Sequence, residues 1–396
     1  MSDKLLYYIK KYYAVIVSLT VFIIYMITLA PSVLHIDAGE LAAVQATLGI
    51  AHPTGYPLFT IWGYLFLLIP LPFTKIISAN ILSSLWCALG LFFLIKSLTI
   101  IFSHIPSEVL EKSIQKRIKP EPTNSKNEIR NYIIPSVAAA ITLAFTNTYW
   151  FQSTSVEVYS LQIFLFALLL FSVVYAFFSP NDNLGKWIWV GLAFALGFSN
   201  HMTTMLAIPF AGILFFSRER FNKKSLHKIL VVTISSLPIL ILIYLYLPIR
   251  ANSNPEINWG NPLNFENFWR HFTGKQYQVW LFSSIDSAKK QLGYFIQNLP
   301  AEFAYFPLII AFIGAFYLHK RNKVILYAVL ATFIFGTLYS INYDIVDIDS
   351  YFLLPYFMVA ILCAFGYRQI MNSLSKNIAN NFITGLIIIG LSIVPL

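Results

Sequence analysis

Long apolar runs recur along the whole sequence, and they constrain the fold of this chain more than any other feature. Of its 396 residues, 58% are hydrophobic and only 11% are charged, whereas roughly 25% of the residues in soluble domains are charged. A helix needs about 20 apolar residues to cross a bilayer. The sequence therefore predicts an all-α, polytopic integral membrane protein in which residues 1–396 form a single transmembrane domain.

Eleven of these runs are predicted to be transmembrane helices. The first is too long for the core of a signal peptide and lacks a cleavage site of small residues, so it is kept as a span. The predicted spans cover residues 12–30, 77–102, 132–149, 158–178, 185–200, 202–217, 229–248, 303–318, 324–341, 351–367 and 381–396.

Two further segments need a separate interpretation. The run 58–71 is too short to cross a bilayer, and it is predicted to be a re-entrant or interfacial helix. Basic residues flank the segment 185–217 on both sides. We therefore expect a hairpin that turns at Ser199-Asn200-His201 rather than one long helix.

The lysine and arginine residues define the expected orientation. With the N-terminus in the cytoplasm, most of them fall in cytoplasmic segments such as the loop 103–131, as the positive-inside rule requires. The first outer loop, 31–76, and a long outer loop, 249–302, then lie on the opposite side. Because the basic residues are scattered over short loops, the net charge of +10 reflects orientation and does not indicate nucleic-acid binding.

Acidic residues that border the predicted spans are the strongest functional signal, because an ionised carboxylate near a bilayer centre costs roughly 2.5–3.5 kcal/mol. Asp37 and Glu40 share one face of a helix that starts near Asp37. Such a pair could deprotonate a hydroxyl group or hold a metal ion. The alternative is that Asp37 caps the helix and Glu40 is solvated. Pro53, Gly55 and Pro57 then force a turn into the short helix that follows.

Four other polar or aromatic residues border the outer face. Glu157 either belongs to a pocket wall or stabilises the first turn of a span. His201, at the predicted turn, could contact an anionic ligand, although a histidine at a helix end is more often structural. Arg250 either binds a phosphate or snorkels to the interface. Trp259 suits a platform for a sugar ring or an interfacial aromatic belt.

Asp344, Asp347 and Asp349 form a concentrated negative segment without a basic neighbour. They could bind substrate hydroxyl groups or a divalent cation such as Mg²⁺, Mn²⁺ or Ca²⁺, or form a polar loop. The two cysteines, Cys87 and Cys363, lie within apolar runs, so neither a disulfide framework nor a Cys/His metal site is expected. We expect no metal and no firm cofactor, with a divalent cation at the acidic segment as the alternative.

Five motifs, in this order, carry a resemblance to a known family. They are D-x-G-E-L with H-P-x-G-Y-P-L, W-x-Q-(x)4-E-V-Y, N-H at a helix turn, L-P-I-R followed by N-W-G-N-P, and N-Y-D-I-x-D-I-D-S-Y-F. Over residues 12–367 the chain resembles a membrane family whose animal member is a protein O-mannosyltransferase of extracellular immunoglobulin-like domains. That family belongs to the GT-C glycosyltransferases, which use polyprenyl-phosphate-linked sugars on the outer or lumenal face.

The resemblance implies that Asp37 or Glu40 is the catalytic residue, placed in the first outer loop between two membrane-surface helices. Together with the residue chemistry above, it leads us to expect two groups of binding residues. Donor and phosphate contacts are expected from His52, Tyr56, His201 and Arg250, and substrate contacts from Glu157, Tyr159, Asn200, Trp259, Asp344 and Asp347.

The expected function is the inverting transfer of a sugar, mannose by resemblance, from a polyprenyl-phosphate donor to a hydroxyl group, most simply a protein Ser or Thr. One alternative is the same chemistry on a glycolipid or cell-wall polymer. Another is a transporter or flippase of lipid-linked sugar, which should show charged residues at mid-bilayer and repeat symmetry. The expected partners are the lipid-linked sugar, an acceptor protein or glycan, and membrane lipid. Abundant Ile, Lys and Asn favour a bacterial inner membrane, with the site facing the periplasm.

Overall fold

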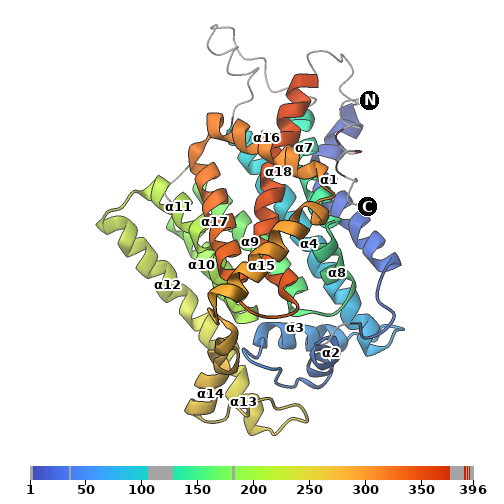
Figure 1. Cartoon of the computed structure of the whole chain (residues 1–396), viewed down its shortest axis with the longest axis vertical. Helices are drawn as coiled ribbons and strands as arrows, with labels where there is room; N and C mark the ends of the chain where they lie inside the picture. The colour runs from blue at the N-terminus through green and yellow to red at the C-terminus, as the bar shows by residue number, and fades with distance from the viewer. Residues whose placement is uncertain are drawn as a thin grey trace.

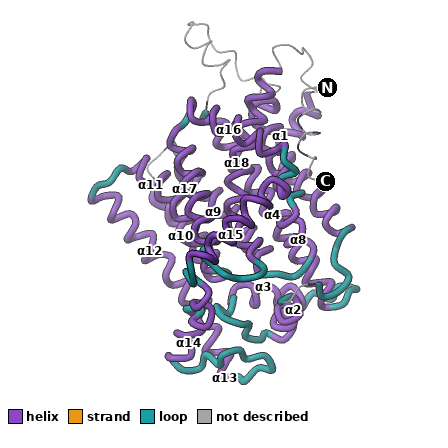
Figure 2. Tube along the Cα trace, in the orientation of Figure 1, coloured by secondary structure: helices purple, strands orange, loops and turns teal. Residues whose placement is uncertain are grey.

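The computed structural model of the protein describes residues 3–34, 37–105, 128–180 and 183–374, together with residues 388, 390 and 392. Within this part, helices form the regular structure and the β pairing consists of two isolated bridges. Figures 1 and 2 show a bundle of long helices with shorter helices at one end. The prediction of an all-α polytopic membrane protein is confirmed. Most of the loop 103–131 and of the predicted span 381–396 lies outside the described residues.

The main bundle consists of α1 (Asp3–Ile27), α4 (Lys75–His104), α7 (Ile134–Ala144), α9 (Val158–Phe177), α10 (Leu184–Asn200), α11 (Ile208–Glu219), α12 (Lys223–Tyr244), α16 (Phe306–Arg321), α17 (Lys323–Ile341) and α18 (Leu353–Leu374). The shorter or peripheral elements are α2 (Ala38–Thr47), α3 (Pro57–Leu67), η1 (Ile129–Ile133), α8 (Asn147–Thr154), η2 (Met202–Ala207), α13 (Tyr246–Asn252), α14 (Phe265–Phe272), η3 (Lys275–Trp280), α15 (Ile285–Glu302) and η4 (Ile348–Phe352). Among the described residues, six helices are long and apolar enough to cross a membrane, or up to eight if each of two bent pairs is one span. The count of eleven spans stays a prediction.

The predicted span 132–149 is not one straight helix. The axis bends by 73° between α7 and α8, because Thr146 adopts an extended conformation at the start of α8. Glu302, at the end of α15, then accepts a hydrogen bond of 2.7 Å from the backbone N–H of Thr148. This long-range contact satisfies a free N–H group at the start of α8, and no local sequence signal predicts it.

The hairpin expected within 185–217 is confirmed. α10 ends at Asn200, and η2 and α11 lead the chain back along the bundle. As a result, Trp187 near the start of α10 meets Phe215 near the end of α11, with 4.8 Å between the ring centroids. The turn itself is tight, because a Cβ atom on Gly197 would lie 2.8 Å from Oγ1 of Thr204.

The short apolar run after the first outer motif forms α3, as expected. Its eleven residues extend about 16 Å at 1.5 Å per residue, which is about half of a hydrocarbon core. Figure 1 shows α2 and α3 lying across one end of the bundle. Gly63 allows α3 to approach α2 closely, since a Cβ atom there would lie 2.1 Å from Cδ of Gln45.

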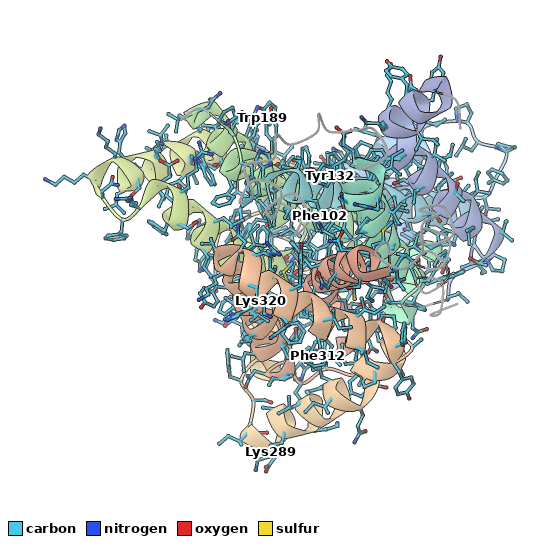
Figure 3. All side chains as sticks on the ribbon, turned by 90° about the horizontal axis from the view of Figure 1, so that it is seen from above. Phe102, Tyr132, Trp189, Lys289, Phe312 and Lys320 are labelled. Carbon is cyan, nitrogen blue, oxygen red and sulfur yellow. The ribbon has the colours of Figure 1, made fainter. Side chains whose placement is uncertain are left out.

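Small residues also bring α18, a deeply buried helix of the core, against α16. A Cβ atom on Gly314 would lie 1.8 Å from the carbonyl oxygen of Leu362, and one on Gly366 would lie 2.0 Å from that of Ile310. Such close backbone contact is typical of packed membrane helices. The view from above in Figure 3 shows Phe102 in the middle of the bundle and Trp189 at its periphery, in agreement with their exposed fractions of 0% and 68%.

The two ends of the bundle differ in charge. The α11–α12 and α16–α17 connections, which carry Arg218–Lys224 and Lys320–Lys323, lie at one end together with the start of α1. α2 and α3 lie at the other end (Figure 1). The positive-inside rule therefore predicts that the first end faces the cytoplasm and that α2 and α3 lie on the opposite face.

Candidate active site

A cavity of about 330 Å³ lies at the end of the bundle that carries α2 and α3. Its size falls within the roughly 300–1,000 Å³ typical of small-molecule sites. Its acidic, imidazole and phenol side chains are Asp37, His52, Tyr56, Glu157, Tyr159, His201, Tyr277, Tyr339, Tyr343, Asp347 and Tyr351. Among the described residues, no lysine or arginine belongs to the lining. Because three of the lining side chains are carboxylic acids, we call this space the acidic cavity.

Asp37 occupies the N-cap position of α2, but its side chain makes no capping hydrogen bond. The helix start is instead held by the backbone, where the Leu41 N–H donates to the carbonyl of Asp37 at 2.9 Å. The carboxylate thus lines the acidic cavity instead of completing the helix. The structure therefore does not support the alternative in which the Asp37 side chain caps the helix.

Glu40 lies one helical turn further on and holds His52 rather than lining the cavity. Its Oε1 accepts a hydrogen bond of 2.7 Å from the His52 backbone N–H. Nδ1 of His52 lies 3.2 Å from both carboxylate oxygens, and Nε2 lies 3.0 Å from the hydroxyl of Tyr56. Glu40, His52 and Tyr56 therefore form one chain of polar contacts that ends in the cavity.

The charges of Glu40 and His52 support each other. Burial disfavours both charged forms, but the hydrogen bond and the charge of Glu40, with Asp37 and Glu157 adding to them, raise the pKa of His52. Burial also acts against Glu40, yet the hydrogen bonds and charge of His52 lower its pKa. Both shifts favour the ion pair of carboxylate and imidazolium near neutral pH.

His201 forms an aromatic wall of the cavity. Its ring stacks on Tyr56 at 5.7 Å with an interplanar angle of 7°, and it lies 5.2 Å from Tyr159 and 5.8 Å from Tyr351. Burial, together with the charge of His52, lowers the pKa of His201 to about 3. His201 is therefore neutral, and it can offer a hydrogen bond but no positive charge.

Glu157 and Asp347 bring two further carboxylates to the lining. Glu157 precedes α9 in an extended conformation, and its side chain is buried. Asp347 comes from the segment before η4. The other two acids of that segment make their contacts elsewhere. Ser287 donates a hydrogen bond of 2.8 Å to Asp344, and Tyr294 donates one of 2.8 Å to Asp349.

Three of the predicted binding residues support the site from outside the cavity lining. Arg250 donates from Nε to the Leu48 carbonyl at 2.6 Å, at the end of α2. Trp259 donates its backbone N–H to the Ile50 carbonyl at 3.2 Å. Asn200 donates to the Val158 carbonyl at 3.1 Å and so connects the end of α10 to the start of α9.

Some residues of the site were not among those predicted, including Tyr351, which contacts Tyr159 at 5.7 Å. Tyr277 also lines the cavity and lies 6.0 Å from the ring of His52. Asn80 on α4 accepts from the Val156 N–H at 2.8 Å and donates to the Ala30 carbonyl at 2.9 Å. An asparagine inside an apolar run was the available signal, since a buried amide needs partners.

Among the described residues, one group could hold a metal ion. Ligand atoms of Asp37, Glu40 and His52 all lie within 4.8 Å of one another, and two carboxylates with an imidazole are common ligands of divalent metals. The acidic segment 344–349 does not form such a group among the described residues. The most suitable position for a cation therefore lies in the first outer loop and not in the segment 344–349.

Comparisons with known proteins agree with these motifs. Residues 37–225 match the family described as the N-terminal domain of protein O-mannosyl-transferase TMEM260. The chain is 25% identical over 394 residues to "Protein O-mannosyl-transferase tmem260" of Dictyostelium discoideum, across 89% of this chain and 44% of that protein. It is 24% identical over 296 residues to "Protein O-mannosyl-transferase TMEM260" of Mus musculus, across 70% and 38% of the two chains.

The chain spans less than half the length of these curated relatives. The matched range 37–225 nevertheless contains both carboxylates of the first outer loop and the histidines of the acidic cavity. Over residues 37–225, just under half of its length, the chain is therefore similar to the TMEM260 family of membrane proteins.

Proposed function

We propose that this protein is an inverting O-mannosyltransferase that moves mannose from a polyprenyl-phosphate donor to the hydroxyl group of a protein Ser or Thr. The observation that carries the proposal is the Asp37 carboxylate, which lines the acidic cavity without serving its own helix. The names of the relatives support the sugar and the kind of acceptor.

The proposed reaction is a single displacement. The Asp37 carboxylate removes the proton of the acceptor hydroxyl while the acceptor oxygen forms a bond to the anomeric carbon. The bond from that carbon to the phosphate oxygen breaks, and the electron pair leaves with the polyprenyl phosphate. Attack opposite the leaving group inverts the anomeric configuration. A phosphate leaving group needs charge stabilisation and no proton, so one base is sufficient.

His52 is the proposed source of that stabilisation. Glu40 raises the pKa of its ring and so favours the charged form, and the described lining contains no lysine or arginine. If Nε2–H donates to the Tyr56 oxygen at 3.0 Å, the Tyr56 hydroxyl can exchange its long contact of 3.4 Å with the Pro53 carbonyl for a hydrogen bond to a phosphate oxygen. The neutral ring of His201, stacked on Tyr56, then holds that phenol in place.

A lipid-linked donor fits the position of the acidic cavity. The cavity lies at the end of an apolar bundle, next to the short apolar helix α3. A polyprenyl tail can remain in the bilayer while its sugar phosphate enters the cavity from the membrane surface. By the distribution of basic residues, this surface is the non-cytoplasmic one, which in a bacterium is the periplasmic face of the inner membrane.

The test uses the full chain in nanodiscs with a peptide that contains Ser and Thr. Radiolabelled polyprenyl-phosphate mannose and GDP-mannose are offered as separate donors, and the anomeric configuration of the product is read by NMR. The proposal expects transfer from the lipid donor alone, with inverted configuration. Transfer from GDP-mannose alone, or retained configuration, contradicts the proposed donor or mechanism, and no transfer from either contradicts the proposed activity.

A further inference from the structure

A second cavity, of about 490 Å³, lies beside the first and has the opposite charge. Pro53 belongs to both linings. The polar and basic side chains of the second lining are Asn267, Arg270, His271, Lys275 and Gln276. None of the described lining residues is acidic, and we call this space the basic cavity.

His271 is the buried polar side chain that distinguishes the basic cavity from an ordinary charged surface. The side chain is 2% exposed, and neither ring nitrogen makes a hydrogen bond of normal geometry within the described part of the chain. Burial and the charge of His52 lower its pKa to about 4, against the weaker effects of the Ala51 carbonyl and Glu40. The neutral ring carries one N–H donor, which a ligand can share with the Ala51 carbonyl.

Arg270 and Lys275 supply the charge. Arg270 lies 3.8 Å from Glu266, but both side chains are more than half exposed, and such surface pairs contribute little. Its place in the last turn of α14 also suits the helix dipole, so the charge alone does not identify a ligand site. The buried ring of His271 beside it, whose nitrogens make no hydrogen bond of normal geometry among the described residues, is the independent observation that does.

The two faces of α14 indicate whether the basic cavity binds a lipid headgroup or a ligand that is dissolved in water. Phe265 and Trp269 are 78% and 53% exposed and lie four residues apart on one face of the helix. Tryptophan and other amphipathic rings concentrate at membrane surfaces. Asn267 and Arg270, which line the basic cavity, lie on the opposite face. Figure 1 places α14 beyond α2 and α3, at the far end of the molecule.

We propose that the basic cavity binds a carboxylate side chain of the acceptor polypeptide, close to the hydroxyl group that receives the sugar. This inference rests on the proposed function, because it assumes a protein acceptor. Gly274 lines the acidic cavity and its neighbour Lys275 lines the basic cavity. Extended chain covers about 3.3–3.6 Å per residue, so an Asp or Glu within about four residues of the acceptor can reach Arg270 and Lys275.

The experiment compares two sets of fluorescent peptides, each with a single Thr. One set has Asp at one position, one to four residues from the Thr on either side, and the other set has Asn there. Binding to the full chain in phosphatidylcholine nanodiscs is measured by anisotropy without a sugar donor. At the best spacing, we expect the Asp peptide to bind roughly tenfold more tightly, as for one charge-assisted hydrogen bond.

Matched variants locate the binding site. Arg270→Gln and Lys275→Gln should each reduce the Asp-to-Asn affinity ratio severalfold, and the double variant should bring it to about one. Lys289→Gln, which removes an exposed lysine outside the basic cavity, should retain the ratio. Equal binding of both peptide sets, or a ratio that survives the double variant, overturns the inference.

Two further outcomes separate this inference from other readings. If Arg270→Gln and Lys275→Gln lower binding to vesicles that contain phosphatidylglycerol but leave the peptide ratio intact, the cavity binds a lipid headgroup and the inference is wrong. If the Asp peptide binds selectively but no donor supports transfer, the acidic-peptide site stands and the proposed function fails. If transfer to both sets is equal and no affinity difference exists, the function stands and the inference fails.

Discussion

Asp37 and Glu40, two carboxylates three residues apart, have different tasks in the structure. Asp37 faces the acidic cavity without a capping contact, whereas Glu40 holds His52 through backbone and side-chain hydrogen bonds. The first arrangement suits a general base, which must be able to take a proton from a substrate. The second suits a residue that keeps a histidine charged and oriented.

Replacing Asp37 with Asn should reduce mannose transfer about 100-fold or more, as expected for loss of a general base. The fold should survive, because the Asp37 side chain makes no capping hydrogen bond. Transfer from radiolabelled donor and thermal unfolding are measured side by side. Asp286→Asn is the matched control, since its side chain is 93% exposed. Normal transfer by the Asp37 variant would assign the base to another residue.

The pH dependence should report on His52. Its pKa is raised in the fold despite burial, mainly by the hydrogen bond to Glu40. A reaction that needs the charged ring therefore slows as the pH rises through that raised pKa, and any stability from the pair is lost over the same range. Glu40→Gln removes the carboxylate that raises the pKa of His52, so the alkaline limb of the rate profile should move to lower pH. Glu266→Gln is the control, because its side chain is 80% exposed, and it should leave the alkaline limb in place. If the limb is also unchanged in Glu40→Gln, His52 does not control it.

At the scale of elements, the site depends on contacts that bring helix ends together. Arg250 at α13 contacts the end of α2, and Asn200 connects α10 to α9. Asn80 on α4 connects the segment after α1 to the segment before α9. These residues lie on different elements, and each of them hydrogen-bonds to backbone groups at or beside the end of a helix.

Asn80→Ala should destabilise the protein by about 2–4 kcal/mol, because it leaves one buried N–H and one buried carbonyl without a partner. It should also lower transfer, since Val156, which loses its contact, directly precedes Glu157. Unfolding in nanodiscs and transfer rate are the measurements. Asn298→Ala, which removes an exposed hydrogen bond to the Tyr294 carbonyl, serves as control. Equal stability of the two variants would contradict the assigned role.

At the scale of the whole molecule, the charge asymmetry of the bundle predicts which end faces the cytoplasm. Both native cysteines, Cys87 and Cys363, are buried and free, so an introduced cysteine can be labelled selectively. Val346 near the acidic cavity is 98% exposed, and Phe221 at the basic end is 77% exposed. A membrane-impermeant maleimide should label Val346→Cys in intact cells and Phe221→Cys only after permeabilisation. The reverse pattern would invert the topology.

Much of the site could be predicted from local sequence. Asp37 and Glu157 were identified because carboxylates beside apolar runs are costly without a function, and His52 was identified from the resemblance. Tyr351 was not identified, because aromatic residues are common in this chain and also fit a membrane belt. Arg250 illustrates the limit. Its type suits phosphate, but its actual contact is a carbonyl about 200 residues away in the sequence.

The sequence by itself determined that this is an all-α membrane protein, where its hairpin turns and which end is basic. Hydropathy, turn residues and charge are local properties, so they can be read without knowing any contact. Only the tertiary structure decided that Asp37 faces the cavity while Glu40 supports His52, and that two cavities of opposite charge adjoin at Pro53. These arrangements depend on contacts between distant segments, such as Ile50 with Asn258, which packing of the whole bundle creates.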